Sequence, residues 1–163
     1  MIELSLEEAF SGTSRVLPLE GQKIRITIKP GTADGQTLRL KDKGAPSING
    51  GAAGDLYLNI KIPTHHVFSR EGDNLILKKD VDLYTGILGG KMEVPTLSGL
   101  VSITIAEGTQ SGKRLRLKGK GMPIYGKKDA FGDLMVELNL QTPTRLNEQE
   151  RELFVKLQQL NSL

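Results

Sequence analysis

The sequence predicts a mainly β protein, built from two tandem small β-sandwich-like domains with short helical turns and a C-terminal amphipathic helix. The first observation behind this prediction is a repeat, because LRLKDKG at 38–44 returns as LRLKGKG at 115–121. The second is the content of 19 Gly and seven Pro in 163 residues, which favours short strands joined by turns. The third is a run of apolar residues at helical spacing near the C-terminus.

The repeat covers most of the chain. A shift of 77 residues aligns 5–46 with 82–123, and sixteen of the 42 aligned positions are identical. This period is longer than that of solenoid repeats and indicates a duplicated domain. We therefore expect a first domain at 1–68, a second at 69–142 and a C-terminal segment at 143–163. The junction at 65–73 is the expected hinge.

Each copy is predicted to open with a short helical turn. Ser5 and Glu8 have the spacing of a capping box, in which each side chain satisfies the backbone N–H of the other. Asp82 is the expected N-cap of the second turn. Gly12 and Gly89 then end the two turns, since glycine adopts the backbone conformation that terminates a helix.

Strands are expected to follow each helical turn, because apolar and polar residues alternate with period two. A Gly-Thr-x-x-Gly turn comes next in each copy. The Leu-Arg-Leu-Lys segments then place leucines on one face and cations on the other. The predicted strands are 23–28, 38–41 and 56–62 in the first copy and 100–105, 115–118 and 134–140 in the second.

The tail predicts a helix of a different kind. Asn147 and Glu150 repeat the capping-box pattern, and an apolar stripe follows at helical spacing. Either this stripe packs on the second domain or it pairs with a second chain. The residues of the stripe are Leu153, Phe154, Leu157 and Leu160.

Composition excludes several classes of protein. The net charge of +3 is too small to make nucleic acid the default partner, and the absence of Cys removes disulfides and thiolate chemistry. No apolar run reaches the length of a membrane span, and the acidic N-terminus is not a signal peptide. A soluble cytoplasmic protein is expected.

No catalytic constellation is evident, so we predict a non-enzyme without a cofactor or bound metal. Residues 108–114 (GTQSGKR) lack the spacing of a phosphate-binding loop and are interpreted as a turn. His65 and His66 are adjacent on an extended segment, where neighbouring side chains point to opposite faces, and no third ligand is near in sequence. They are interpreted as linker residues.

The stretch 113–128 carries seven cations and no acid. It is interpreted either as a solvated strand face or as a patch for DNA or another polyanion, although Tyr125 alone is available for stacking. A third alternative is that the cations of both repeats, with Arg15, Lys23 and Arg25, hold an acidic peptide tail through charge-assisted hydrogen bonds.

The first domain has more apolar positions than about 68 residues readily bury. Part of them is expected to form an exposed groove beside an open strand edge, where an extended peptide adds a strand. The alternative is that all of them belong to the core.

Several motifs together resemble one family, the C-terminal substrate-binding region of DnaJ-type co-chaperones of the forty-kilodalton heat-shock class. The resemblance covers essentially the whole chain in order. Its motifs are SLEEAFSG (5–12), IKPGTADGQTLRL (28–40), GDLY (54–57), FSREGDNL (68–75) and LRLKGKGMP (115–123).

The resemblance implies a concrete function. Two tandem β-domains capture unfolded client polypeptide, chiefly in an apolar groove on the first, and the client passes to a DnaK-type chaperone ATPase. Some members also bind the acidic C-terminal tail of that ATPase, which implicates Arg15 and Lys23. A terminal helix commonly makes a homodimer, here through the stripe at 153–160. The implied groove residues are Ile2, Leu4, Leu17, Leu19, Ile26, Leu58 and Ile60.

Two family modules do not occur in this sequence. The J-domain with its His-Pro-Asp signature is absent, so the chain alone is not expected to stimulate an ATPase, and we interpret it as truncated. The cysteine-rich zinc module is replaced by a tight turn at Glu20-Gly21, which indicates the zinc-free subclass resembling curved-DNA-binding-protein-like members. DNA binding through 113–128 is therefore the alternative function. For the groove, Leu17→Glu or Leu58→Glu is expected to abolish client protection without unfolding the domain.

Overall fold

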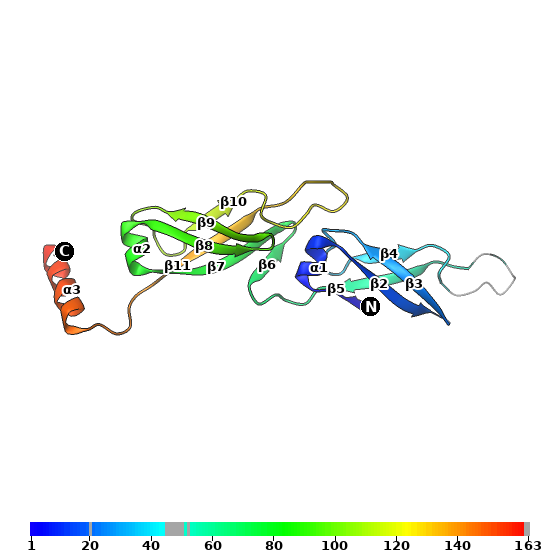
Figure 1. Ribbon diagram of the computed structural model, residues 1–163, viewed down its shortest axis with the longest axis horizontal. Helices are drawn as coiled ribbons and strands as arrows, with labels where there is room; N and C mark the ends of the chain where they lie inside the picture. The colour runs from blue at the N-terminus through cyan, green and yellow to red at the C-terminus, as the bar shows by residue number, and fades with distance from the viewer. Residues whose placement is uncertain (20, 45–50, 52, 162–163) are drawn as a thin grey trace.

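The structure, a computed structural model, describes residues 1–19, 21–44, 51 and 53–161, and in this part of the chain it is mainly β. Two β-rich halves lie end to end, and a separate helix follows the second (Figure 1). The N-terminal half holds β1 (Ile2–Glu3), α1 (Leu6–Ser11), β2 (Thr13–Leu19), β3 (Gln22–Ile28), β4 (Thr37–Leu40) and β5 (Leu56–Lys61). The C-terminal half holds β6 (Phe68–Glu71), β7 (Asn74–Asp82), α2 (Leu83–Leu88), β8 (Gly90–Thr96), β9 (Gly99–Ile105), β10 (Arg114–Leu117) and β11 (Leu134–Gln141). The terminal helix is α3 (Glu148–Leu160).

The predicted helix starts are confirmed. Ser5 Oγ accepts from the Glu8 N–H at 3.1 Å, and the Ser5 N–H donates to the Glu8 carboxylate at 2.9 Å. In the second copy the Thr85 N–H donates to Asp82 Oδ1 at 2.9 Å. Both turns end at a glycine with positive φ, as expected from the residue pattern. The turn at Glu20-Gly21 lies partly outside the described residues.

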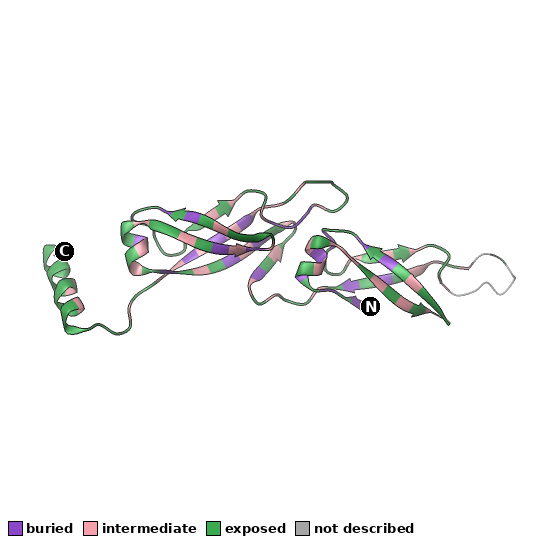
Figure 2. Ribbon diagram, viewed as in Figure 1, coloured by how far each residue is buried: buried purple, intermediate pink, exposed green. Residues whose placement is uncertain are grey.

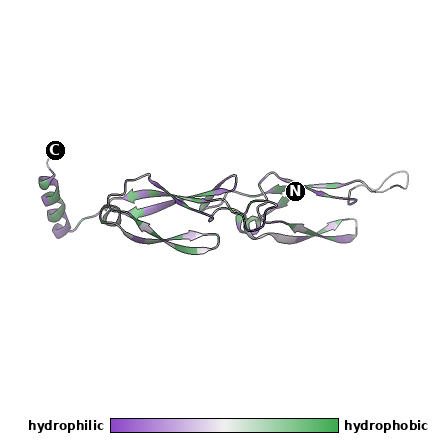
Figure 3. Ribbon diagram, turned by 90° about the horizontal axis from the view of Figure 1, so that it is seen from above, coloured by the Kyte–Doolittle hydropathy of each residue, from purple (hydrophilic) through white to green (hydrophobic). Residues whose placement is uncertain are grey.

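Each half consists of a hairpin facing a larger sheet, and Figure 3 shows them as two layers. In the N-terminal half the antiparallel pair β2–β3 faces the sheet β1-β5-β4. In the C-terminal half the pair β8–β9 faces the sheet β10-β11-β7-β6. The helices α1 and α2 connect equivalent strands in the two copies, so the duplication seen in the sequence is also a duplication of topology.

Alternation along the strands places apolar side chains between the two layers, so buried and exposed segments alternate in Figure 2. The core of the N-terminal half is small and consists of Ile2, Leu4, Ile26, Ile28, Leu58 and Ile60. The core of the C-terminal half is larger, and several of its members have no exposed surface, among them Leu75, Val81, Val94, Leu134, Val136 and Leu138.

The junction differs from the flexible hinge expected at 65–73. Phe68 lies opposite Leu77 in the pair β6–β7 and is only 5% exposed, because it belongs to the core of the C-terminal half. Leu6 and Ala9 of α1 pack in that same core. The side chain of Arg70 bonds back to the N-terminal half, as described below. The two halves are therefore joined by a paired strand and by packing.

The histidines of the junction also differ from expectation. Their rings stack, with centroids 4.7 Å apart and planes at 18°, because residues 63–67 do not form a strand that would point them apart. His65 Nε2 lies 2.7 Å from a Glu7 carboxylate oxygen, and its Nδ1 accepts from the N–H groups of Val67 and Phe68 at 3.0 and 3.2 Å. His65 thus links α1 to the start of β6.

Helix α3 begins at its predicted cap, since Asn147 and Glu150 bond reciprocally as a capping box. None of its described side chains is buried. Phe154 is half-buried and its ring lies 6.3 Å from that of Tyr84 on α2, while the rest of the stripe faces outward. Leu153, Leu157 and Leu160 are 55%, 57% and 83% exposed. None of the helices in the described part of the chain is long and apolar enough to cross a membrane.

Candidate peptide-binding site

A set of half-buried apolar residues lies at the border of the N-terminal core, where hairpin β2–β3 faces the sheet. We call it the apolar strip. Five members pack against the core, and Leu19 continues the same face of β2 beyond Leu17. The strip consists of Leu17, Leu19, Ile24, Leu38, Leu40 and Leu56.

The equivalent positions of the second copy are more deeply buried than this strip. Val94 and Leu134, the counterparts of Leu17 and Leu56, have no exposed surface. Strand β7 runs parallel to the whole of β11, and its Leu75 lies opposite Leu134. Strand β1 pairs with β5 at only two positions, Ile2↔Ile60 and Glu3↔Lys61.

Five of the seven predicted groove residues lie in the interior, which corrects the prediction that they line an exposed surface. They sit on the inner faces of the two layers, where alternation directs them into the core. Their exposed fractions are 7% for Ile2, 1% for Leu4, 3% for Ile26, 8% for Leu58 and 2% for Ile60. Only Leu17 and Leu19 of the predicted set belong to the apolar strip. Leu58→Glu would bury a charge and unfold this half, contrary to the expectation above.

The other strip residues were missed as site residues. Leu38 and Leu40 belong to the repeated Leu-Arg-Leu segment, which the sequence assigns to the core in both copies. Their period-two pattern is correct, but it does not distinguish a covered face from a partly open one.

A free strand edge lies beside the strip. Within the described residues β2 pairs only with β3, from Thr13↔Ile28 to Leu19↔Gln22. The backbone C=O groups on its other edge, and its N–H groups except at Pro18, which has none, are therefore available to an added strand. Because Leu17 and Leu19 point to the same face of β2, a strand added at this edge would have alternate side chains beside the strip.

Arg15 lies on the same face of β2 and is already engaged. Its Nη2 donates to both Glu8 carboxylate oxygens, at 2.8 and 2.9 Å. The pKa of Glu8 is lowered, first by the hydrogen bond from the Ser5 N–H and then by Arg15. Arg15 Nε is buried without a hydrogen-bond partner among the described residues. A second carboxylate at Arg15 thus competes with Glu8.

Lys23 lies on the other face of the hairpin. It pairs with Pro18 and is exposed, whereas Arg15 faces inward beside Leu17. The structure therefore does not bring together the two cations that the resemblance implicates in tail binding. The sequence could not reveal this, because the face of each residue depends on the register across the turn.

The basic stretch 113–128 is partly neutralised. Arg116 Nε donates to Asp133 Oδ2 at 2.5 Å, and Arg114 Nε lies 3.8 Å from a Glu137 oxygen. The aromatic that the polyanion alternative requires, Tyr125, sits in a loop rather than on the strand. This arrangement favours the solvated strand face for the part of the stretch that lies on β10.

Comparison with known proteins places the chain among one set of relatives. The family described as DnaJ C terminal domain matches residues 1–143. The chain is similar to the chaperone protein DnaJ of Burkholderia thailandensis, 46% identical over 135 residues, which cover 82% of this chain and 35% of the relative. The DnaJ of Ruminiclostridium cellulolyticum is 42% identical over 132 residues, covering 81% and 35%. That of Sinorhizobium medicae is 38% identical over 152 residues, covering 93% and 40%. The chain thus spans less than half the length of each of these relatives.

Proposed function

The chain belongs to the DnaJ C-terminal domain family, and we propose that it binds unfolded polypeptide on its N-terminal half, along β2 and the apolar strip. The bound client adds a strand at the free edge of β2 and places apolar side chains against Leu17, Leu19 and their neighbours. This is a binding activity and needs no catalytic group.

The observation that carries the proposal is the half-buried apolar strip beside the free edge of β2. Leu17 and Leu56 are half-buried, while Val94 and Leu134 at the same positions have no exposed surface. Leu17 and Leu19 point to the face of β2 that borders the strip, so a strand added at the edge of β2 would lie beside it. The small core of the N-terminal half supports the same assignment, since this half gains buried apolar area when a client covers the strip.

The proposed specificity is low. Backbone hydrogen bonds along a strand edge recognise any extended segment, and a shallow strip of Leu and Ile accepts many apolar side chains. Such a site suits non-native chains of diverse sequence. We propose that the captured client passes to a DnaK-type chaperone, the role that the family resemblance implies, and the relatives are themselves named as chaperones.

The test is protection of a chemically denatured client from aggregation, followed by light scattering. Leu17→Glu places a charge on the half-buried strip and is expected to abolish protection. The matched control is Val16→Glu on the same strand, because Val16 is 58% exposed and points to the opposite face. Circular dichroism and thermal denaturation establish that both variants fold.

Two outcomes contradict the proposal. One is a folded Leu17→Glu variant that protects the client as well as the unaltered chain does. The other is an equal loss of protection in Val16→Glu, which would place the binding surface on the outer face of the hairpin. Leu56→Glu provides an independent second position, from the sheet rather than the hairpin.

The exposed stripe of α3 supports a homodimer as a further part of the proposal. A helix that carries three exposed leucines on one stripe and no buried side chain is poorly stabilised by its own chain. Pairing with the same helix of a second chain would cover these leucines. A dimer would present two apolar strips to one client and raise its apparent affinity through linkage of the two sites.

A further inference from the structure

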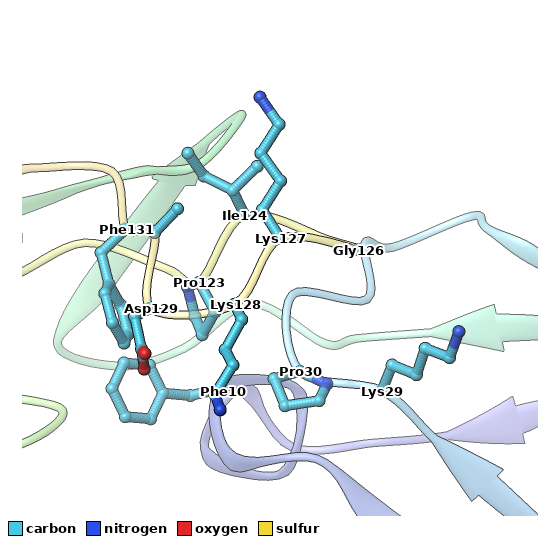
Figure 4. Close-up of a pocket in the computed structure, with 11 residues that line it drawn as sticks. Phe10, Lys29, Pro30, Pro123, Ile124, Gly126, Lys127, Lys128, Asp129 and Phe131 are labelled. Carbon is cyan, nitrogen blue, oxygen red and sulfur yellow. The ribbon is translucent and has the colours of Figure 1, made fainter.

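A hollow of about 480 Å³ lies at the junction of the two halves, away from the apolar strip. We call it the junction hollow. Helix α1 and the turn that follows β3 form one wall, and the loop between β10 and β11 forms the other (Figure 4). The apolar part of the lining consists of Phe10, Pro30, Pro123, Ile124 and Phe131.

Two aromatic rings from different halves meet at one side of the hollow. The ring centroids of Phe10 and Phe131 are 6.1 Å apart with planes at 40°, and Phe131 is 42% exposed. Neither ring fills the space between the walls. A large apolar side chain of a ligand would therefore find aromatic contacts from both halves at once.

The walls are held in place before any ligand arrives. In the loop, the Ile124 N–H donates to the Ala130 carbonyl at 2.8 Å and the Gly132 N–H donates to the Met122 carbonyl at 2.9 Å. On the facing wall, a Cβ added to Gly31 would lie 2.5 Å from the Pro123 carbonyl oxygen, so the two walls are in close contact. A preformed site loses little conformational entropy on binding.

Cations surround the hollow. Lys29, Lys127 and Lys128 are exposed, and none of them forms an ion pair with a described residue. In Figure 4, Lys127 and Lys29 extend outward on different sides of the rim, and Lys128 extends toward Phe10. The one acid of the lining is Asp129, whose carboxylate lies beside the Phe10 ring. The rim therefore has an excess of positive charge.

We propose that the junction hollow is a second peptide site, which takes an acidic segment carrying one large apolar or aromatic side chain. The apolar side chain packs against the Phe10 and Phe131 rings on the side that faces the hollow, and the flanking carboxylates pair with the three lysines. This site is independent of the apolar strip, because it shares no residue with it. The segment is one part of a client or partner chain, bound where the two halves meet.

Asp129 favours a peptide over single-stranded nucleic acid. Its carboxylate accepts a hydrogen bond from a peptide N–H, which a phosphodiester backbone does not have. The Phe10 and Phe131 rings are tilted toward each other, so they do not form the open platforms on which successive bases stack.

The probe is a fluorescent peptide of about eight residues, extended over about 26 Å, with one phenylalanine flanked by aspartates and glutamates. Binding is measured by anisotropy at low and high salt. The double substitution Lys127→Glu and Lys128→Glu is expected to weaken binding about ten-fold or more, and added salt to weaken binding to the unaltered chain. The matched control is Lys113→Glu with Lys118→Glu, because these lysines are also exposed but do not line the hollow.

Methyl NMR locates the peptide. The expected result is a shift of the Ile124 methyl signals without a shift of Ile24, which lies on the apolar strip. Phe131→Ala is expected to weaken peptide binding as well. If this variant does not fold, Lys127→Glu/Lys128→Glu still tests the proposal, because both lysines are exposed. A control peptide with alanine in place of the phenylalanine is expected to bind at least about ten-fold more weakly.

Several results would overturn the proposal. The first is that the peptide does not bind at millimolar concentration. The second is that the control variant Lys113→Glu/Lys118→Glu weakens peptide binding as much as Lys127→Glu/Lys128→Glu does. The third is that Arg15→Ala abolishes peptide binding and that the peptide shifts the Ile24 methyl signals. The last result places the peptide on the N-terminal strip. A different result would assign the hollow to nucleic acid. In that case a single-stranded oligonucleotide binds the unaltered chain more tightly than the peptide does, and the double variant Lys127→Glu/Lys128→Glu no longer binds the oligonucleotide. Client protection by the strip is measured separately, so either site can fail without the other.

Discussion

Arg39 Nε donates a 2.6 Å hydrogen bond to Asp55 Oδ2, which ties β4 to the residue directly before β5. The same carboxylate accepts from the Asp42 N–H at 3.0 Å through Oδ1, so it also closes the turn after β4. Arg116 and Asp133 repeat this arrangement in the second copy. The repeated LRLK and Gly-Asp motifs are therefore two parts of one clamp, which joins the ends of the loop that connects the paired strands.

The clamp predicts a dependence of stability on acid. The pKa of Asp55 is lowered from 3.8, first by the Asp42 N–H and then by Arg39, and the pKa of Asp133 is lowered, first by the Gly119 N–H. A carboxyl whose pKa is lower in the folded state contributes stability above its unfolded pKa. That contribution is lost as pH falls below about 4 toward the folded value. Urea denaturation from pH 7 to pH 3 measures the free energy of unfolding at each pH. This free energy is expected to fall less steeply with acid in Asp133→Asn than in the unaltered chain. An equally steep fall in both proteins contradicts this role.

The turn of the clamp predicts that substitutions at equivalent positions of the two copies change stability in opposite directions. Asp42 has a φ of 58°, and Gly119 at the equivalent position has a φ of 74°. A residue with a side chain is strained in this left-handed region, whereas glycine is not. We expect Asp42→Gly to stabilise the N-terminal half and Gly119→Asp to destabilise the C-terminal half, each by about 1 kcal/mol. Thermal denaturation measures both, and a lower melting temperature for Asp42→Gly would show that its side chain makes a compensating contact.

The junction predicts coupled unfolding of the two halves. Arg70 Nη1 donates to the Thr32 carbonyl at 2.7 Å and Nη2 to the Gly31 carbonyl at 3.0 Å, and burial lowers the pKa of the guanidinium, which stays charged at neutral pH. Arg70→Ala removes both bonds and is expected to cost about 2 kcal/mol. Differential scanning calorimetry is expected to show the single transition separating into two. Arg145→Ala is the control, because Arg145 is exposed outside both sheets.

The ion pair of Arg15 with Glu8 predicts a gain of binding. Glu8→Gln keeps the capping-box hydrogen bonds, since glutamine also serves in this motif, but removes the charge that occupies Arg15. We propose that the acidic C-terminal tail of a DnaK-type chaperone competes for Arg15, and the variant is then expected to bind a tail peptide several-fold more tightly. Anisotropy measures the affinity. Equal affinity for the variant and the unaltered chain would remove Arg15 from the tail site.

If the exposed stripe of α3 forms the proposed homodimer, charged substitutions on this stripe are predicted to yield a monomer. Leu153→Glu with Leu157→Glu places two charges on the exposed stripe and is expected to convert a homodimer to a monomer without loss of either β-rich half. Multi-angle light scattering at tens of micromolar measures the mass. A monomer mass for the unaltered chain that does not change with concentration would reject the dimer.

Local elements could be read from the sequence because each depends on neighbouring residues. The caps at Ser5, Asp82 and Asn147 and the terminal helix are confirmed, and the alternating strands lie within a residue or two of their predicted bounds. The duplication is also evident in the sequence, since equivalent elements preserve turn glycines and the Leu-Arg-Leu pattern. The stacked histidines and the paired strand at the junction could not be read in this way, because both depend on contacts with distant segments.

Exposure, in contrast, was decided by the tertiary structure. Period-two alternation shows that Leu17, Leu58 and Leu134 face inward, but it does not show what covers them. Leu134 lies beside a parallel strand, Leu58 lies deep between two layers, and Leu17 lies at the border of the N-terminal core. Periodicity, caps and duplication can be read directly from the order of the residues, because these are local or internal comparisons. Which apolar residues stay partly open follows from the folded arrangement, because burial depends on surfaces that the chain brings together from distant positions.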